Sequence, residues 1–101
     1  MATALGIINN GLDEVLRREL RNYRPKNIIV NVVSSDGLLP GPRVYFVLTE
    51  IKGMKSRRRF ISTYRGDNPE GFLEIQKIRL DEMFACNVET YLEGRLYDGS
   101  T

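Results

Sequence analysis

The spacing of apolar residues predicts that the chain opens with a helix. Over residues 5–23, apolar side chains recur every three or four positions, which is typical of an amphipathic helix. Two glycines weaken the first half, so Asn10, followed by Asp13, offers an alternative and later start. Pro25 prevents the helix from continuing.

Three strands are expected after this helix. Residues 27–34 are rich in β-branched side chains, which favour strands. Residues 43–51 alternate with apolar side chains on both faces, which indicates a central strand. Residues 57–64 return as a third strand after a turn at Gly53, and two prolines make 38–42 a loop.

The second half of the chain has a less distinct pattern. Turn-forming residues predict a loop over 67–71, and 72–78 is expected to be a fourth strand. Residues 80–93 match a helical stripe that ends at Gly94. The alternation of Val88, Thr90 and Leu92 is also typical of a strand, but we favour the helix. A short edge strand is expected over 95–97.

These elements predict an α+β fold in one domain covering residues 1–101. The expected sheet has three to four strands and is mainly antiparallel. The N-terminal amphipathic helix and a second helix lie on one face of it.

Composition narrows the classes of function. The chain has no histidine, so the commonest general base and zinc ligand are missing. We therefore expect no metal, no cofactor, no small-molecule substrate and no enzymatic activity. The single cysteine, Cys86, is expected to be a packed, buried thiol. No signal peptide or membrane-spanning stretch is evident, so neither secretion nor membrane insertion is expected.

Charge is distributed unevenly along the chain. Residues 1–65 contain 12 Lys/Arg and 5 Asp/Glu, a balance of +7, whereas residues 66–101 contain 3 Lys/Arg and 8 Asp/Glu, a balance of −5. A subunit with complementary basic and acidic surfaces is suited to head-to-tail contacts, which close into rings or continue as filaments.

Two cationic clusters are candidates for an assembly or anion-binding surface. The first spans the turn before the third strand, and its consecutive arginines must alternate faces, so it is expected to project from the sheet. It consists of Lys52, Lys55, Arg57, Arg58 and Arg59. The second cluster, in and after the N-terminal helix, consists of Arg17, Arg18, Arg21, Arg24 and Lys26. Either cluster is alternatively an ordinary solvated face.

Several apolar residues have two interpretations. Leu38 and Leu39, in the proline-containing loop, are candidates for an interface, and they alternatively fold back onto the core. Two charged residues, Arg17 and Arg21, are further candidates for an interface. Tyr45, Phe60 and Tyr64 are candidates for stacking on nucleic-acid bases, and Tyr45 and Phe60 suit the core equally well.

Residues 7–59 resemble the opening of tail terminator, tail completion or neck proteins of bacteriophages and contractile injection systems. The shared order is an amphipathic helix with an Arg-rich end at Arg24, a strand, a proline-containing loop, a strand at 43–51 and a charged hairpin at 52–59. A second helix across the sheet, as at 80–93, also fits. The resemblance implies a non-enzymatic, ring-forming virion protein, whose partners are its own copies and neighbouring virion proteins. It would act in the virion or the host cytoplasm.

Two other functions stay open. The basic hairpin Lys52–Arg59 suits a small nucleic-acid-binding or regulatory protein, and the third interpretation is an adaptor or inhibitor that docks onto a host protein. Double-stranded RNA-binding domains share the expected order of elements, but they open their second helix with lysines. Here Asp81 and Glu82 occupy that place.

Overall fold

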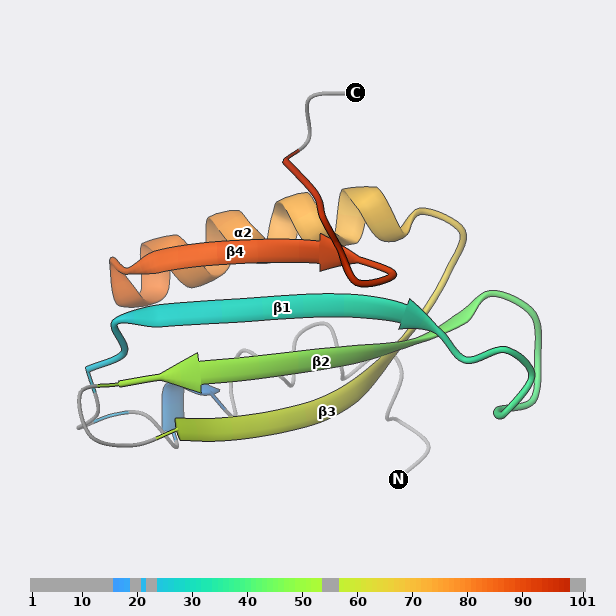
Figure 1. The fold of residues 1–101 in the computed structure, drawn as a ribbon, viewed down its shortest axis with the longest axis horizontal. Helices are drawn as coiled ribbons and strands as arrows, with labels where there is room; N and C mark the ends of the chain where they lie inside the picture. Colours follow the sequence, from blue (N-terminus) through green and yellow to red (C-terminus); the bar gives the residue numbers. More distant parts are fainter. Residues whose placement is uncertain (1–15, 19–20, 22–23, 54–56, 99–101) are drawn as a thin grey trace.

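A five-stranded sheet with a helix across one face forms the body of the protein (Figure 1). The structure is a computed structural model that describes residues 16–18, 21, 24–53 and 57–98. The strands lie in the order β3-β2-β1-β4-β5. The predicted α+β class is confirmed.

The first three strands form an antiparallel meander, as predicted. They are β1 (Asn27–Ser34), β2 (Val44–Lys52) and β3 (Arg57–Arg65). β2 lies between the other two, which confirms its central place. The loop between β1 and β2 contains the two prolines.

The helix α2 (Pro69–Phe84) occupies a segment where the sequence predicts a loop and a fourth strand. The side chain of Asn68 caps it by accepting a hydrogen bond from the Gly71 N–H at 3.0 Å, and Pro69 takes the first helical position. The strand prediction over 72–78 is wrong, and so is the loop beyond Asn68. The turn-forming residues are a helix start.

The helix expected over 80–93 is confirmed only for residues 80–84, which form the end of α2, and it is wrong for the rest, where the strand β4 (Asn87–Leu92) takes its place. Ala85 ends α2 in the left-handed region, with φ of 51°, and its N–H donates to the Asp81 carbonyl at 2.7 Å. β4 then pairs with β1 in parallel, and its alternating residues Val88 and Thr90 are buried.

The short strand β5 (Arg95–Leu96) confirms the predicted edge strand. Glu93 and Gly94 connect it to β4 and both have positive φ, 53° and 81°. Two consecutive residues of this kind are typical of a type I′ hairpin turn. Gly94 therefore serves a turn and not a helix end.

The sheet is mixed and larger than expected. It has five strands, and the parallel pair β1–β4 joins three antiparallel pairs. Because β3 and β4 run in the same direction with β2 and β1 between them, α2 is a crossover that passes over one face.

The core lies between this face and α2. Ile28, Val30 and Val32 of β1 are fully buried, as are Leu73 and Leu80 of α2. Residues 16–18 are helical, in agreement with the predicted N-terminal helix, and the buried side chain of Leu16 joins the same core. Arg21 lies in a turn, and the rest of 5–23 is outside the described residues.

Two buried threonines provide a test of this core. The Thr49 hydroxyl has no hydrogen-bond partner among the described residues, whereas the Thr90 hydroxyl donates to the Tyr97 carbonyl at 2.7 Å. We expect Thr49→Val to raise the free energy of unfolding and Thr90→Val to lower it, each by about 1 kcal/mol. Urea unfolding of both variants measures this. A loss of stability in Thr49→Val would show that this hydroxyl is satisfied.

Candidate functional site

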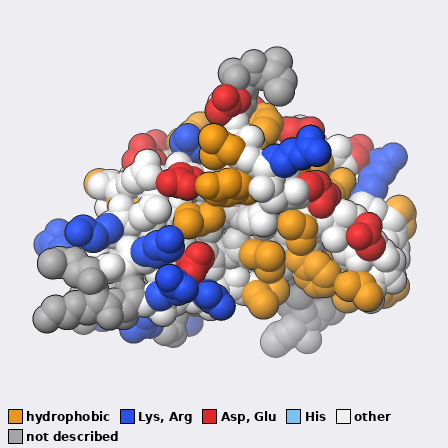
Figure 2. All heavy atoms as spheres, viewed as in Figure 1, with side chains coloured by type: hydrophobic (Ala, Val, Ile, Leu, Met, Phe, Trp, Pro, Cys, Tyr) orange, Lys and Arg blue, Asp and Glu red, His pale blue; other side chains and the backbone are white. Residues whose placement is uncertain are grey.

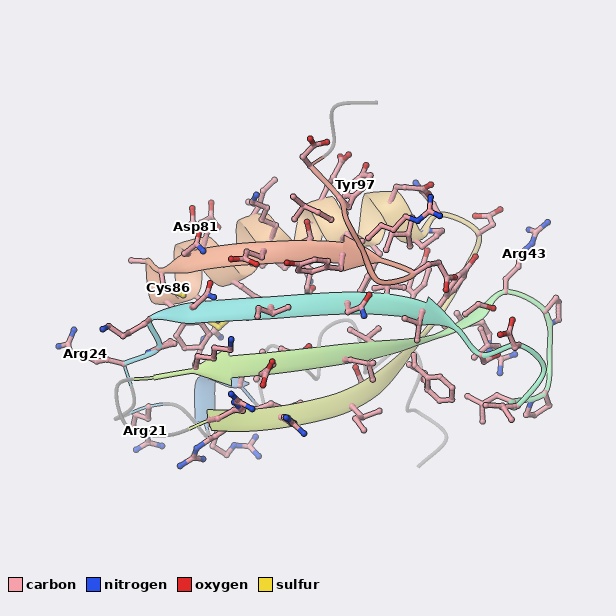
Figure 3. The ribbon with its side chains drawn as sticks, viewed as in Figure 1. Arg21, Arg24, Arg43, Asp81, Cys86 and Tyr97 are labelled. Carbon is pink, nitrogen blue, oxygen red and sulfur yellow. The ribbon has the colours of Figure 1, made fainter. Side chains whose placement is uncertain are left out.

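The chain brings parts of its two cationic clusters together at one end of the sheet. The Lys26 N–H donates to the Lys52 carbonyl at 2.7 Å, and Lys52 pairs in turn with Arg57 of β3. Figure 3 shows Arg21 and Arg24 at this same end. We call this group the basic end; its members are Arg21, Arg24, Lys26, Lys52, Arg57, Arg58 and Arg59.

One carboxylate organises two of these arginines. Glu50 lies across the ladder from Arg59, and its Oε2 is 3.0 Å from Arg57 Nε and 3.6 Å from Arg59 Nε. The side chains of the arginines are 56% and 69% exposed, so these ion pairs contribute little stability. One acid facing two guanidinium groups positions them and leaves an excess of positive charge.

The three consecutive arginines are all exposed and alternate between the faces of β3, as predicted. Arg58 pairs with the core residue Ile51, so it lies on the face that α2 covers. Arg57 and Arg59 lie on the other, open face of the sheet. Lys55, the remaining member of the predicted cluster, is outside the described residues.

Other predicted interface residues lie elsewhere. Arg17 lines a hollow of about 270 Å³ beside Arg79 and Glu82 of α2, on the helical side. Leu38 is 77% exposed and Leu39 is half-buried. Both leucines belong to the loop that follows β1, at the end of the sheet opposite the basic end. The structure therefore does not unite them with the arginines.

The three aromatic candidates for base stacking belong to the core. Tyr45, Phe60 and Tyr64 are partly buried and pack against the main hydrophobic cluster. The ring of Tyr64 stacks on Phe72 of α2 with centroids 4.7 Å apart, and the Tyr45 ring lies 6.1 Å from it. Packing against the core is thus the arrangement of all three, as the alternative for Tyr45 and Phe60 expected.

Most acidic residues belong to the second half of the chain. Its strands β4 and β5 lie beyond β1, away from β2 and β3, and its helix α2 packs across the sheet with Phe72 on Tyr64 of β3. We call the acids of this half the acidic surface; they are Asp67, Glu70, Glu74, Asp81, Glu82, Glu89, Glu93 and Asp98. The outer side of α2 also exposes Ile75 by 52% and Ile78 by 58%. Sequence reasoning missed this pair because it expected a strand over 72–78. On a helix, the three-residue spacing puts both side chains on one face.

The open face of the sheet combines apolar and charged residues. Ile29, Leu48 and Ile61 line a shallow hollow of about 400 Å³ that also meets Glu50 and Arg59. Ile61 is 75% exposed. Figure 2 shows hydrophobic side chains over the middle and right of this face and Lys and Arg side chains at its left, where β2 ends and β3 begins.

Cys86 is half-buried just after α2 and packs against the core. Burial raises the pKa of its thiol, and the nearby charge of Asp81 raises it further. Less thiolate therefore exists at a given pH than for a free cysteine.

We expect Cys86 to react with a disulfide reagent at pH 8 more slowly than free cysteine does, because only the thiolate reacts. Asp81→Asn should move the thiolate titration to lower pH and speed the reaction, whereas the control Glu82→Gln should leave the pKa unchanged. Absorbance of the released thiol, followed between pH 7 and about 10, measures the titration. A Cys86 rate equal to that of free cysteine would contradict the assigned cause.

The described residues offer neither a metal site nor a membrane span. No group of three or more His, Cys, Asp and Glu residues in this part of the chain is arranged to hold a metal ion. No helix in the described part is both long enough and apolar enough to cross a membrane. In comparisons with known proteins, no family model, curated protein or solved structure matches the chain.

Proposed function

We propose that this is a non-enzymatic assembly protein that self-associates head to tail into a ring, as a tail-terminator-like component of a phage tail or neck. The observation that carries the proposal is the separation of charge across the sheet. The basic end lies just before β1, at the end of β2 and at the start of β3, and the acidic surface lies in and just before α2, on β4 and in the segments on either side of β5.

This separation favours a heterologous contact. A symmetric contact centred on either surface alone would place that surface against its own copy, and like charges would repel. A head-to-tail contact pairs the two surfaces and leaves one of each available for the next subunit. Such contacts close into a ring or continue as a filament.

Apolar residues are available to supply affinity, since charges contribute mainly steering and register. Ile75 and Ile78 are exposed on α2, the helix that carries Glu70, Glu74, Asp81 and Glu82 of the acidic surface. Ile61 is exposed on the strand that carries Arg57 and Arg59. Exposed apolar residues thus occur on the elements that carry either charge, and interfaces commonly combine apolar contact with polar surroundings.

The order of elements also supports the proposal. A three-stranded meander with a charged β2–β3 hairpin is followed by a helix that crosses the sheet. This is the order on which the resemblance to tail terminator proteins rests, although the crossing helix lies at 69–84 and not at 80–93.

Light scattering tests the assembly. We expect the wild-type mass to be a multiple of 11.6 kDa and Arg57→Glu/Arg59→Glu to reduce it to the monomer, because the reversed charges face an acidic neighbour. Asp81→Lys/Glu82→Lys should have the same effect. An equimolar mixture of the two variants should recover the oligomer, since each offers the surface that the other needs. A monomeric wild-type protein, or failure of the mixture to assemble, would overturn the proposal.

Binding of nucleic acid is a second candidate, favoured by the convergence of the two cationic clusters. Seven cations at one end of a sheet suit a phosphate backbone, whose binding depends on the release of counterions.

Fluorescence anisotropy with labelled duplex DNA tests this candidate. We expect Arg21→Ala/Arg24→Ala to flatten the slope of log K against log salt by about 0.9 for each phosphate that the variant no longer neutralises. The control Arg43→Ala removes a cation at the far end of the sheet and should leave the slope unchanged. Absence of binding at low salt to both duplex and single-stranded nucleic acid would remove this function.

A further inference from the structure

Within the described part of the chain, the outer edge of β3 is not paired with another strand. Among the described residues, β3 pairs with β2 alone, and it is the last strand of the sheet on that side. It is nine residues long, and its arginines and Ile61 are exposed. Such an edge presents a row of backbone donors and acceptors to any strand that approaches it.

The ladder with β2 determines which backbone groups face outward. The Gly66 N–H donates to the Arg43 carbonyl at 3.0 Å, and hydrogen-bonded pairs alternate with non-hydrogen-bonded pairs along an antiparallel ladder. Every second residue of β3 therefore directs its N–H and C=O away from the sheet. These residues are Arg57, Arg59, Ile61, Thr63 and Arg65.

The charge of β3 limits what binds there. The strand RRRFISTYR contains four arginines and no acid. A second β3 paired antiparallel about Ile61 would put Arg57 next to Arg65, so like charges oppose that dimer. Among the described residues, the strand acids of a second copy are Glu50 and Glu89, which lie on β2 and β4 inside the sheet, and the other acids lie on α2 or in loops. An acidic segment of another protein fits the edge better.

We propose that β3 binds an extended acidic segment of a partner protein, which adds to the sheet as a sixth strand. Its backbone pairs with the outward N–H and C=O groups of Arg59, Ile61 and Thr63. Its carboxylates lie beside Arg57 and Arg59 on the open face, and an apolar side chain on the same face contacts Ile61. Main-chain pairing supplies affinity and the alternate side chains supply specificity. This surface goes beyond the proposed self-association, which does not require strand pairing.

The test separates backbone pairing from charge attraction. The probe is a blocked nine-residue peptide that carries, on the strand face it shares with Arg57, Arg59 and Ile61, glutamates opposite the two arginines and a valine opposite Ile61; the charge control has lysines in place of the glutamates. A third peptide has the sequence of the acidic peptide, with methyl groups on the backbone nitrogens of the edge that would pair with β3, so it keeps every charge and loses those N–H donors. Anisotropy should show that the acidic peptide binds and that the lysine control does not. The acidic peptide should bind at least about tenfold more tightly than its N-methylated form.

A matched pair of variants tests the protein side. Ile61→Pro removes an outward N–H without removing a hydrogen bond to β2, whereas Ile61→Ala shortens the side chain and keeps the N–H. We expect Ile61→Pro to weaken peptide binding at least about tenfold and Ile61→Ala to weaken it less than about threefold. Circular dichroism checks the fold, and Thr63→Pro with Thr63→Ala repeats the comparison if Ile61→Pro is unfolded.

Several results would overturn the inference. If the acidic peptide and its N-methylated form bind equally well, only charge attracts the peptide. The same conclusion follows if wild type and both proline variants bind the acidic peptide equally well. If the proline variants lose the oligomer and retain the peptide, the occupant of the edge is a second copy. If the proline variants lose peptide binding and keep the wild-type mass in light scattering, the inference is supported. This holds whether or not the wild type forms a ring, so each proposal can fail without the other.

Discussion

The parallel pairing of β4 with β1 is the contact on which the rest of the structure depends. A parallel neighbour cannot be reached through a hairpin, so the chain must cross a face of the sheet between β3 and β4, and α2 makes that crossing. The crossed face becomes the core and the other face remains open. β1 becomes an interior strand, which is why Ile28, Val30 and Val32 are fully buried. The same pairing carries the acidic half of the chain to the far side of β1 and leaves β3 at the opposite edge.

Sequence patterns predicted the elements whose signals are local. β1, β2 and β3 follow from β-branched runs and alternation between turn-forming residues. The elements over residues 69–92 were not predicted correctly, because Asn68 and Pro69 suit both a turn and a helix start. The exposed Ile75 and Ile78 obscure the amphipathic pattern of α2. The strand at Val88 and Thr90 was visible as an alternation, but a helical stripe covered the same residues. Its pairing with β1, distant in sequence, decides between them.

The candidate surfaces show the same division. The exposure of Arg57, Arg58 and Arg59 followed from three charges in succession on a strand, and Leu38 was expected to be a candidate for contact. The meeting of Arg24 with these arginines was not predictable locally, since it depends on where the chain enters β1 beside the end of β2. Prediction of the edge position of β3 likewise requires the strand order. In contrast, the difference in charge between the two halves of the chain could be predicted from the sequence, and the strands of the two halves lie on separate sides of the sheet.

The place of β4 in the sheet also has a consequence for the newly made chain on the ribosome. β1 is synthesised long before its parallel neighbour, and β2, β3 and α2 must all emerge before β4 does. During that interval β1 has one satisfied edge and one vacant edge, flanked by side chains that are fully buried in the finished protein. A nascent chain halted within α2 would offer this edge to the β4 of any neighbouring copy, and exchange of β4 between copies is the misassembly to which this topology is exposed.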